Sequence, residues 1–328
     1  MKNIQADIKS GNFKQVYLLY GEEAYLKQQY KQNLVKALNP DGDTMNFNHY
    51  EGKGIDVKQL IDLCETMPFF AERRVVLLED TGFFKNKCEE LADYMKELPD
   101  YLYLVFAETE VDKRNRMYKA VKACGSIAEF IRQDEKTLMR WAAGILGKAG
   151  KKITQRDMEL LLTKTGTDMG NLRMEMEKLI SYTEGRDVVT AEDIEEICTT
   201  QTTNRIFDMV RAVTEKNQKR ALELYYDLLT LKEPPMRILF LLAKQYRQLL
   251  LAKQFAAAGL AQTEIASKLG VPSFVVRNIS TCARAYTISE LEQAVEDFVD
   301  AEESVKTGRL EDKLSVELLI IKYSSKVK

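Results

Sequence analysis

The sequence predicts an α/β doubly wound domain at the N-terminus, followed by two all-helical domains. Over residues 1–135, short apolar runs rich in strand-forming residues alternate with helical patterns, which is typical of parallel strands joined by crossover helices. After Gln133 the strand patterns stop and helical patterns continue to the end of the chain. We therefore predict domains at 1–135, 136–203 and 204–328.

The first element of the α/β domain is a strand at 16–20, closed by Gly21, and a helix at 23–38 follows and ends before Asn39-Pro40. The remaining elements are predicted as strands at 45–50, 73–78, 102–106 and 126–131, and as helices at 56–66, 87–97 and 114–123. Continuous apolar strands such as 75–78 fit a sheet that is covered on both faces.

Glycines and prolines divide the rest of the chain into helices. In the second domain the helices are predicted at 135–148, 154–165, 168–183 and 190–198, with breaks at Gly150, Gly166 and Gly185. In the third domain the breaks fall at Pro234-Pro235, Gly259, Gly270 to Pro272, and Gly308.

Composition and charge are those of an ordinary soluble globular protein. Hydrophobic residues make up 45% of the 328 residues and charged residues 30%. The 48 basic and 50 acidic residues give a formal net charge of -2. A strongly basic domain would indicate nucleic acid as the main partner, so autonomous DNA binding is not the default interpretation.

Neither a metal site nor a membrane segment is expected. The five cysteines stand far apart without a C-x-x-C pair, and His49 is the single histidine, so a structural zinc site is not predicted. Scattered free thiols fit a reducing cytoplasm. The N-terminus lacks the apolar run of a signal peptide, and no apolar stretch reaches 18 residues, so we expect a cytoplasmic protein.

The loop after the first strand lacks the residues that bind phosphates. A P-loop reads G-x-x-x-x-G-K-[ST], whereas residues 21–28 read GEEAYLKQ. Glu22 and Glu23 place two negative charges where phosphate charge would lie. We interpret them instead as acids in a first helical turn, where they favour the helix dipole.

Other catalytic patterns are absent too. The sequence holds neither a G-x-S-x-G elbow nor a G-x-G-x-x-G fingerprint, and nothing near His49 suggests a nucleophile. Glu79 and Asp80 end an apolar strand, but without a P-loop a magnesium role is weakly supported. We predict no catalytic residue, no cofactor and no metal.

Three colinear segments resemble one protein family. Residues 16–26 (VYLLYGEEAYL) resemble its opening strand and Gly-Glu-Glu turn, and residues 63–76 (LCETMPFFAERRVV) resemble a helix, a binding tip and the next strand. Residues 301–310 (AEESVKTGRL) with 316–319 (VELL) resemble its C-terminal stretch. The family is the delta subunit of the bacterial DNA polymerase III clamp loader.

This resemblance implies an AAA+-like domain arrangement that does not hydrolyse ATP. It implies binding to the beta sliding clamp, with one clamp interface held open, through Met67, Phe69 and Phe70. It also implies that residues 204–328 form a collar that assembles with the ATPase (gamma/tau) subunits and the delta-prime subunit, and that primed DNA is met inside the assembled complex. Pro68 and two aromatics stand where other members often have Leu-Phe.

The residues around Pro68 allow an interpretation of their own. Pro68 is expected to end the preceding helix near Met67, which leaves Phe69 and Phe70 on a turn before a buried strand. The pattern alone favours both rings as core residues. Adjacent aromatics on a turn rarely both point inward, however, so an exposed protein-binding anchor is the alternative.

Two rival functions remain open at this point. Residues 262–279 resemble a helix-turn-helix whose second helix carries Arg277 and Asn278, as in a DNA-binding regulator, although a tight helix pair inside a bundle gives the same pattern. The second rival is an ATPase with a degenerate phosphate loop.

Overall fold

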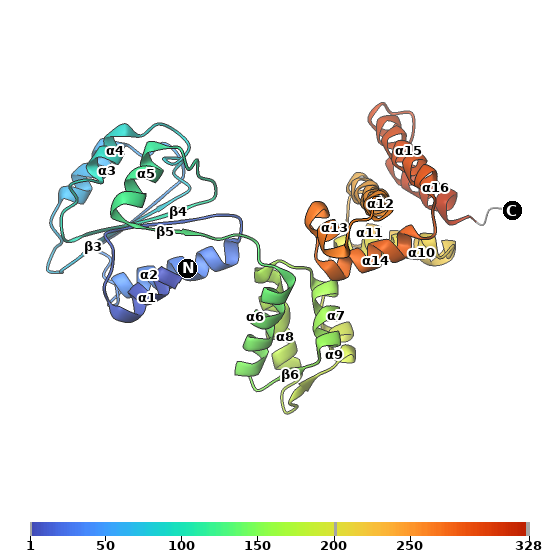
Figure 1. Ribbon diagram of the computed structural model, residues 1–328, viewed down its shortest axis with the longest axis horizontal. Coiled ribbons are helices and arrows are strands. Elements are labelled where there is room, and N and C mark those ends of the chain that lie inside the picture. Colours follow the sequence, from blue (N-terminus) through green and yellow to red (C-terminus); the bar gives the residue numbers. More distant parts are fainter. Residues whose placement is uncertain (1, 200–201, 326–328) are drawn as a thin grey trace. The chain divides into compact units, whose positions relative to one another are not determined.

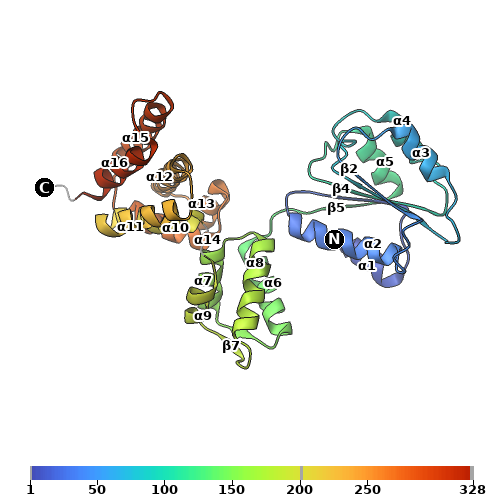
Figure 2. The same ribbon diagram turned by 180° about the vertical axis from the view of Figure 1, so that it is seen from behind.

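The computed structural model describes residues 2–199 and 202–325. The chain forms two compact units, Met1–Gln133 and Asp134–Lys328. Figure 1 and Figure 2 show an α/β unit built around a sheet and a second unit that is mostly helical.

The first unit contains a five-stranded sheet with the order β2-β3-β4-β1-β5, in which all neighbouring strands run parallel. Its strands are β1 (Val16–Tyr20), β2 (Phe47–Glu51), β3 (Arg74–Glu79), β4 (Leu102–Glu108) and β5 (Ser126–Glu129). Every residue of β1 is buried, as are five of the six in β3, because helices cover both faces of these strands.

Helices cover the sheet on both sides (Figure 1). One side carries α1 (Lys2–Ser10) and α2 (Ala24–Leu38), and the other carries α3 (Val57–Glu65), α4 (Glu89–Tyr94) and α5 (Arg116–Cys124). Alternate residues of β1 serve the two cores: Tyr17 and Leu19 pack with α1 and α2, whereas Val16 and Leu18 pack with α3 to α5. The predicted doubly wound class is confirmed.

One helix of this unit was not predicted. Lys2–Ser10 forms α1, which buries Ile4 fully and packs Ile8 against the core beneath α2. The segment has only these two isoleucines and one alanine as apolar residues, which is too few for a helical period to stand out. Tertiary packing therefore defines this helix.

The second unit begins with a four-helix group and a short strand pair. Its helices are α6 (Glu135–Lys148), α7 (Gln155–Thr165), α8 (Met169–Tyr182) and α9 (Ala191–Ile197). The expectation that no strand follows Gln133 was wrong in one detail, since β6 (Lys152–Ile153) pairs in parallel with β7 (Val188–Val189). Two-residue strands are too short to produce an alternating pattern in the sequence.

Seven further helices complete the second unit around a core of their own. They are α10 (Thr202–Thr214), α11 (Gln218–Thr230), α12 (Pro235–Ala257), α13 (Gln262–Leu269), α14 (Ser273–Ala283), α15 (Ile288–Lys306) and α16 (Asp312–Ser324). Tyr246 of α12 lies at the centre of this core against the rings of Tyr286, Phe298 and Tyr323. A division of the unit at residue 203 stays a prediction.

Candidate partner-binding site

The turn between α3 and β3 exposes three large apolar side chains. Met67 is 76% exposed, Phe69 57% and Phe70 95%. The two phenylalanine rings pack edge to face with centroids 4.5 Å apart. We call residues 66–70 the tip. The interpretation of both rings as core residues therefore fails, and the predicted turn after Pro68 leaves them at the surface.

A buried asparagine holds one side of the tip. Asn46, directly before β2, is only 3% exposed. Its side-chain Oδ1 accepts a hydrogen bond from the Phe69 main-chain N–H at 2.6 Å, and its Nδ2 donates to the Phe69 carbonyl at 2.8 Å. Both main-chain polar groups of Phe69 are satisfied by one side chain, as a sheet neighbour would satisfy them.

A buried arginine holds the other side. Arg74, the first residue of β3, is 5% exposed. Its Nε donates to the Thr66 carbonyl at 2.8 Å and its Nη2 to the Met67 carbonyl at 3.2 Å. Since Thr66 is the C-cap residue of α3, the guanidinium also satisfies a carbonyl that the helix leaves without a partner.

The backbone of the tip is strained at its most exposed residue. Phe70 has a φ of 49°, in the left-handed region that bulky side chains rarely adopt. Such a conformation costs about 1–3 kcal/mol and persists only where the surroundings impose it. Asn46 and Arg74 hold the main chain directly before Phe70, and the Phe70 ring is exposed to solvent.

The opposite, carboxyl edge of the sheet is where a doubly wound domain ordinarily binds nucleotide, and here the backbone fills it. A Cβ at Gly21 would lie 2.3 Å from the Phe130 carbonyl oxygen, so the loop after β1 packs directly on the chain that leaves β5. The main-chain N–H of Glu23 donates to the same carbonyl at 3.0 Å. An N–H that would face a phosphate is thereby already used.

The interpretation of Glu22 and Glu23 as residues of the first helical turn was wrong. The helix α2 begins at Ala24, so Glu23 is its N-cap residue and Glu22 precedes it. The Glu22 carboxylate lies 3.4 Å from the guanidinium of Arg132, in an exposed ion pair. The Glu23 N–H bonds to the Phe130 carbonyl, a partner distant in the sequence that no local pattern indicates.

Cations near this edge are engaged by protein groups. Lys27 stands six residues after Gly21, where a P-loop would place its lysine, yet its Nζ donates to the Glu108 carbonyl at 2.9 Å and burial lowers its pKa. Lys31 pairs with Glu79 at 2.6 Å, and His49 Nε2 lies 2.9 Å from the same carboxylate.

A buried carboxylate completes this network. Glu108, at the end of β4, accepts from the Thr81 hydroxyl at 2.6 Å and the Thr81 N–H at 3.1 Å. The pKa of Glu108 is raised, because the effect of burial outweighs the lowering effect of these hydrogen bonds. Over residues 2–199 and 202–325, no three His, Cys, Asp or Glu side chains gather in a way that could hold a metal ion.

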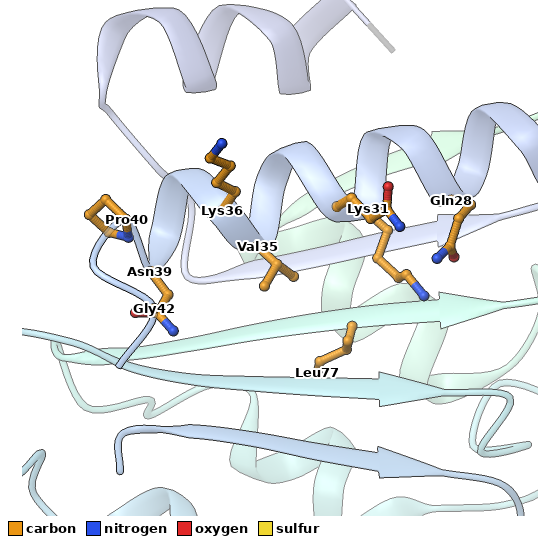
Figure 3. A pocket seen from close by; sticks show the side chains of 9 residues that line it. Gln28, Lys31, Val35, Lys36, Asn39, Pro40, Gly42 and Leu77 are labelled. Carbon is orange, nitrogen blue, oxygen red and sulfur yellow. The ribbon is translucent and has the colours of Figure 1, made fainter. Parts of the chain in front are cut away.

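A hollow of about 520 Å³ runs along α2 over the sheet (Figure 3). It is lined by Gln28, Lys31, Gln32, Val35, Lys36, Asn39, Pro40, Gly42 and Leu77. It includes none of the predicted tip residues. Its most buried cation, Lys31, already pairs with Glu79, so the hollow offers no unpaired buried charge to a ligand.

The helix-turn-helix pattern corresponds to a helix pair packed inside the second unit. Gly270 joins α13 to α14 in a left-handed conformation. Val275 of α14 packs against apolar residues of α6 to α9, and Arg277 lies 3.5 Å from the Glu159 carboxylate. Two side chains of the supposed recognition helix are thus used internally, which favours the helix-pair interpretation.

Sequence reasoning missed the two residues that hold the tip. Asn46 lies 23 residues before its partner Phe69, and no local pattern links them. Arg74 carried a weak signal, because a cation inside a continuous buried strand needs partners.

Across the described part of the chain, no helix is long and apolar enough to span a membrane.

Comparison with known proteins agrees with this structure. A family model described as DNA polymerase III, delta subunit, matches residues 17–130, and one for the C-terminal domain of that subunit matches residues 203–323. Together they span more than two thirds of the chain. The chain belongs to the family of DNA polymerase III delta subunits. The matched N-terminal region contains the whole tip and the closed carboxyl edge.

Individual members of the delta family are similar over most of their length. DNA polymerase III subunit delta of Bacillus subtilis is 26% identical, covering 97% of this chain and 95% of that protein. A probable delta subunit of Aquifex aeolicus is 22% identical, covering 78% of this chain and 75% of its own. The solved Bacillus subtilis DNA clamp loader delta protein has a TM-score of 0.67 at 24% identity and 99% coverage of both chains. This likeness confirms the fold, an α/β domain followed by helical domains.

Proposed function

We propose that this delta-family chain is the non-catalytic clamp-gripping subunit of a clamp loader. Its tip binds the beta sliding clamp through Met67, Phe69 and Phe70 and holds one clamp interface open for loading onto primed DNA. The observation that carries this proposal is an exposed, mutually packed phenylalanine pair on a turn fixed by buried polar side chains. Rigid aromatic anchors of this kind dominate protein interfaces.

The energetics suit an anchor that works with neighbouring surface. Fully burying one such side chain stabilises a complex by about 1.5–3 kcal/mol, so the two rings contribute roughly 3–6 kcal/mol before costs. Micromolar affinity requires about 8 kcal/mol. Met67 and adjacent residues must therefore add contact area, and the exposed Met45 beside Asn46 is one such residue.

The absence of a catalytic role is supported by the carboxyl edge. The backbone of Phe130 lies directly against Gly21, where a phosphate-binding loop would need open space. Lys27, at the position of the P-loop lysine, donates to the Glu108 carbonyl. If this chain does not hydrolyse ATP, partner subunits of the loader must carry out the hydrolysis. ATPase (gamma/tau) subunits and a delta-prime subunit are the partners that the family resemblance implies.

The surface of α16 supports an assembly role for residues 204–328. This helix buries Val316, Leu319 and Ile320 in the core, yet it also exposes Leu314, Leu318 and Ile321. A helix that is apolar on several faces is expected to be covered by another chain. We propose that α16 takes part in the collar contacts with the other loader subunits.

The tip is tested by replacing Phe69 and Phe70 together with Ala. Clamp affinity, measured by calorimetry or surface plasmon resonance with the purified beta clamp, is expected to fall more than a hundredfold, which corresponds to about 3 kcal/mol. The thermal unfolding midpoint is expected to stay unchanged, because the rings contact solvent. Buried rings would instead lose about 3–5 kcal/mol of stability each.

Phe240→Ala is the matched control, because Phe240 is also an exposed phenylalanine, 63% exposed, but lies on α12. It is expected to leave clamp affinity unchanged. If the double variant binds the clamp as tightly as the wild-type chain, the tip is not the contact and the proposal fails.

The assembly role is tested separately with Leu318→Glu. Reconstitution with the ATPase and delta-prime subunits, followed by size-exclusion chromatography, is expected to show weakened assembly. Binding of the isolated chain to the clamp is expected to be retained. Full assembly of the variant would exclude this face of α16 from the collar.

A further inference from the structure

We propose that Asn46 and Arg74 are positioning residues for clamp binding: they do not touch the clamp, but they hold the tip in the shape that binds it. This inference rests on the proposed function of the tip. It assigns a role to two side chains that lie outside the predicted contact set and outside the tip: Asn46 directly precedes β2, and Arg74 begins β3.

The two side chains grip the main chain on both sides of Pro68. Arg74 donates to the carbonyls of Thr66 and Met67, and Asn46 bonds both the N–H and the carbonyl of Phe69. Two side chains therefore fix four main-chain atoms, which belong to three residues of the tip. Because both are at least 95% buried, neither has a surface to offer a partner.

The orientation of Asn46 is itself fixed by Asp43. The Asn46 Nδ2 donates to the Asp43 Oδ2 at 2.5 Å as well as to the Phe69 carbonyl, which leaves its Oδ1 free to accept from the Phe69 N–H. The Asp43 Oδ1 in turn accepts from the Met45 N–H at 2.8 Å. The segment from Asp43 to Asn46 thus supports the tip.

Preorganisation is the reason that these contacts affect affinity. Phe70 holds a left-handed conformation that a free turn would rarely populate. If the tip adopts its binding shape only part of the time, the apparent dissociation constant rises by the inverse of that fraction. Loss of the two Asn46–Phe69 hydrogen bonds is expected to lower the ratio of the binding shape to other shapes by about tenfold, since each contributes roughly a factor of three. The apparent dissociation constant then rises by up to that factor.

The test compares Asn46→Ala with Asn115→Ala in the full-length chain. Asn115 caps α5, accepts from the Met117 N–H at 2.8 Å and donates to the Asn86 carbonyl at 2.9 Å, away from the tip. Both variants remove an asparagine with several hydrogen bonds and are expected to lower the unfolding midpoint. Only Asn46→Ala is expected to weaken beta-clamp binding, by up to about tenfold, at a temperature where both are folded.

Hydrogen exchange gives a second readout that a general loss of stability does not reproduce. The Phe69 amide, whose acceptor is Asn46 Oδ1, is expected to exchange faster in Asn46→Ala and at the wild-type rate in Asn115→Ala, under conditions of local opening. Should Asn46→Ala fail to fold, Arg74→Lys takes its place, because a single ammonium cannot serve the Thr66 and Met67 carbonyls with the same fork geometry.

The outcomes separate this inference from the proposed function. Unchanged clamp affinity in both Asn46→Ala and Arg74→Lys, or an equal loss in Asn115→Ala, would overturn the positioning role while the effect of the Phe69 and Phe70 variant still stood. Absence of clamp binding by the wild-type chain would instead remove the proposed function itself.

Discussion

The two edges of the same parallel sheet use buried polar groups in opposite ways. At the carboxyl edge, Lys27 donates to the Glu108 carbonyl and Lys31 pairs with Glu79, while the Glu108 carboxylate accepts from Thr81. The backbone of Phe130 fills the space at Gly21. At the amino edge, Asn46 and Arg74 also bond inward, but their partners are the carbonyls and N–H of a turn that carries exposed aromatics.

Under the proposed function, the difference explains how a fold that commonly binds nucleotides can serve to bind a protein partner. Doubly wound sheets ordinarily place ligands beyond the carboxyl ends of their strands. Here polar contacts within the chain occupy the carboxyl edge, and exposed apolar side chains lie on the loops that precede β2 and β3. The predictions below test whether the two edges are as independent as their separate hydrogen-bond networks suggest.

The largest effect is expected from closing the carboxyl edge too tightly, with Gly21→Ala. The added Cβ would lie 2.3 Å from the Phe130 carbonyl oxygen, and Gly21 has a φ of 122°. Backbone strain and overpacking each cost about 1–3 kcal/mol, so we expect a loss of stability of roughly 3 kcal/mol or more. Chemical denaturation followed by circular dichroism measures it.

Gly52→Ala is the control for that variant. Gly52 has a φ of 87°, but nothing lies within 4 Å of an added Cβ, so only the strain of about 1 kcal/mol is expected. Clamp affinity of the folded Gly21→Ala fraction is expected to match the wild type. A parallel loss of clamp affinity would show that the two edges of the sheet are coupled.

The elements that sequence reasoning located are those whose signal is local. Buried parallel strands such as 75–78 appear as unbroken apolar runs, and Pro68 ends a helix because of its own ring. Hydrogen-bond partners distant in the sequence leave no such signal. The Asn46–Phe69 pair and the Gly21–Phe130 contact arise from the sheet order, so the tip was predicted without its supports and the α2 start was misplaced by one residue.

A smaller effect is expected at the tip from Phe70→Gly. Glycine adopts the left-handed conformation without the penalty of about 1 kcal/mol that a side chain incurs, although it also increases the entropy of the unfolded chain. The unfolding free energy is therefore expected to stay within about 1 kcal/mol of the wild type or to rise slightly. Clamp affinity is expected to fall at least tenfold, because the most exposed ring is gone.

A loss of affinity without a loss of stability would separate a binding role of the Phe70 ring from a structural one. Denaturant unfolding and clamp titration on one preparation of Phe70→Gly measure both quantities. A large loss of stability would mean that the Phe70 ring supports the fold, and the amino edge would then resemble the carboxyl edge rather than contrast with it.

The smallest expected effect is the response of the wild-type chain to nucleotide, which should be none. Backbone atoms of Phe130 crowd Gly21, the Lys27 ammonium already donates to the Glu108 carbonyl, and Glu22 and Glu23 repel phosphate charge. A ligand present at a hundred times its dissociation constant would stabilise the fold by about 2.7 kcal/mol. Millimolar ATP with Mg²⁺ would therefore raise the unfolding midpoint by several degrees if a site with a dissociation constant of about 10 μM existed.

We expect no shift in a thermal scan and no heat of binding in calorimetry. A Mg²⁺-dependent shift would reopen the interpretation of the chain as an ATPase with a degenerate loop, and its loss in Lys27→Met would locate the nucleotide at the edge that the structure closes.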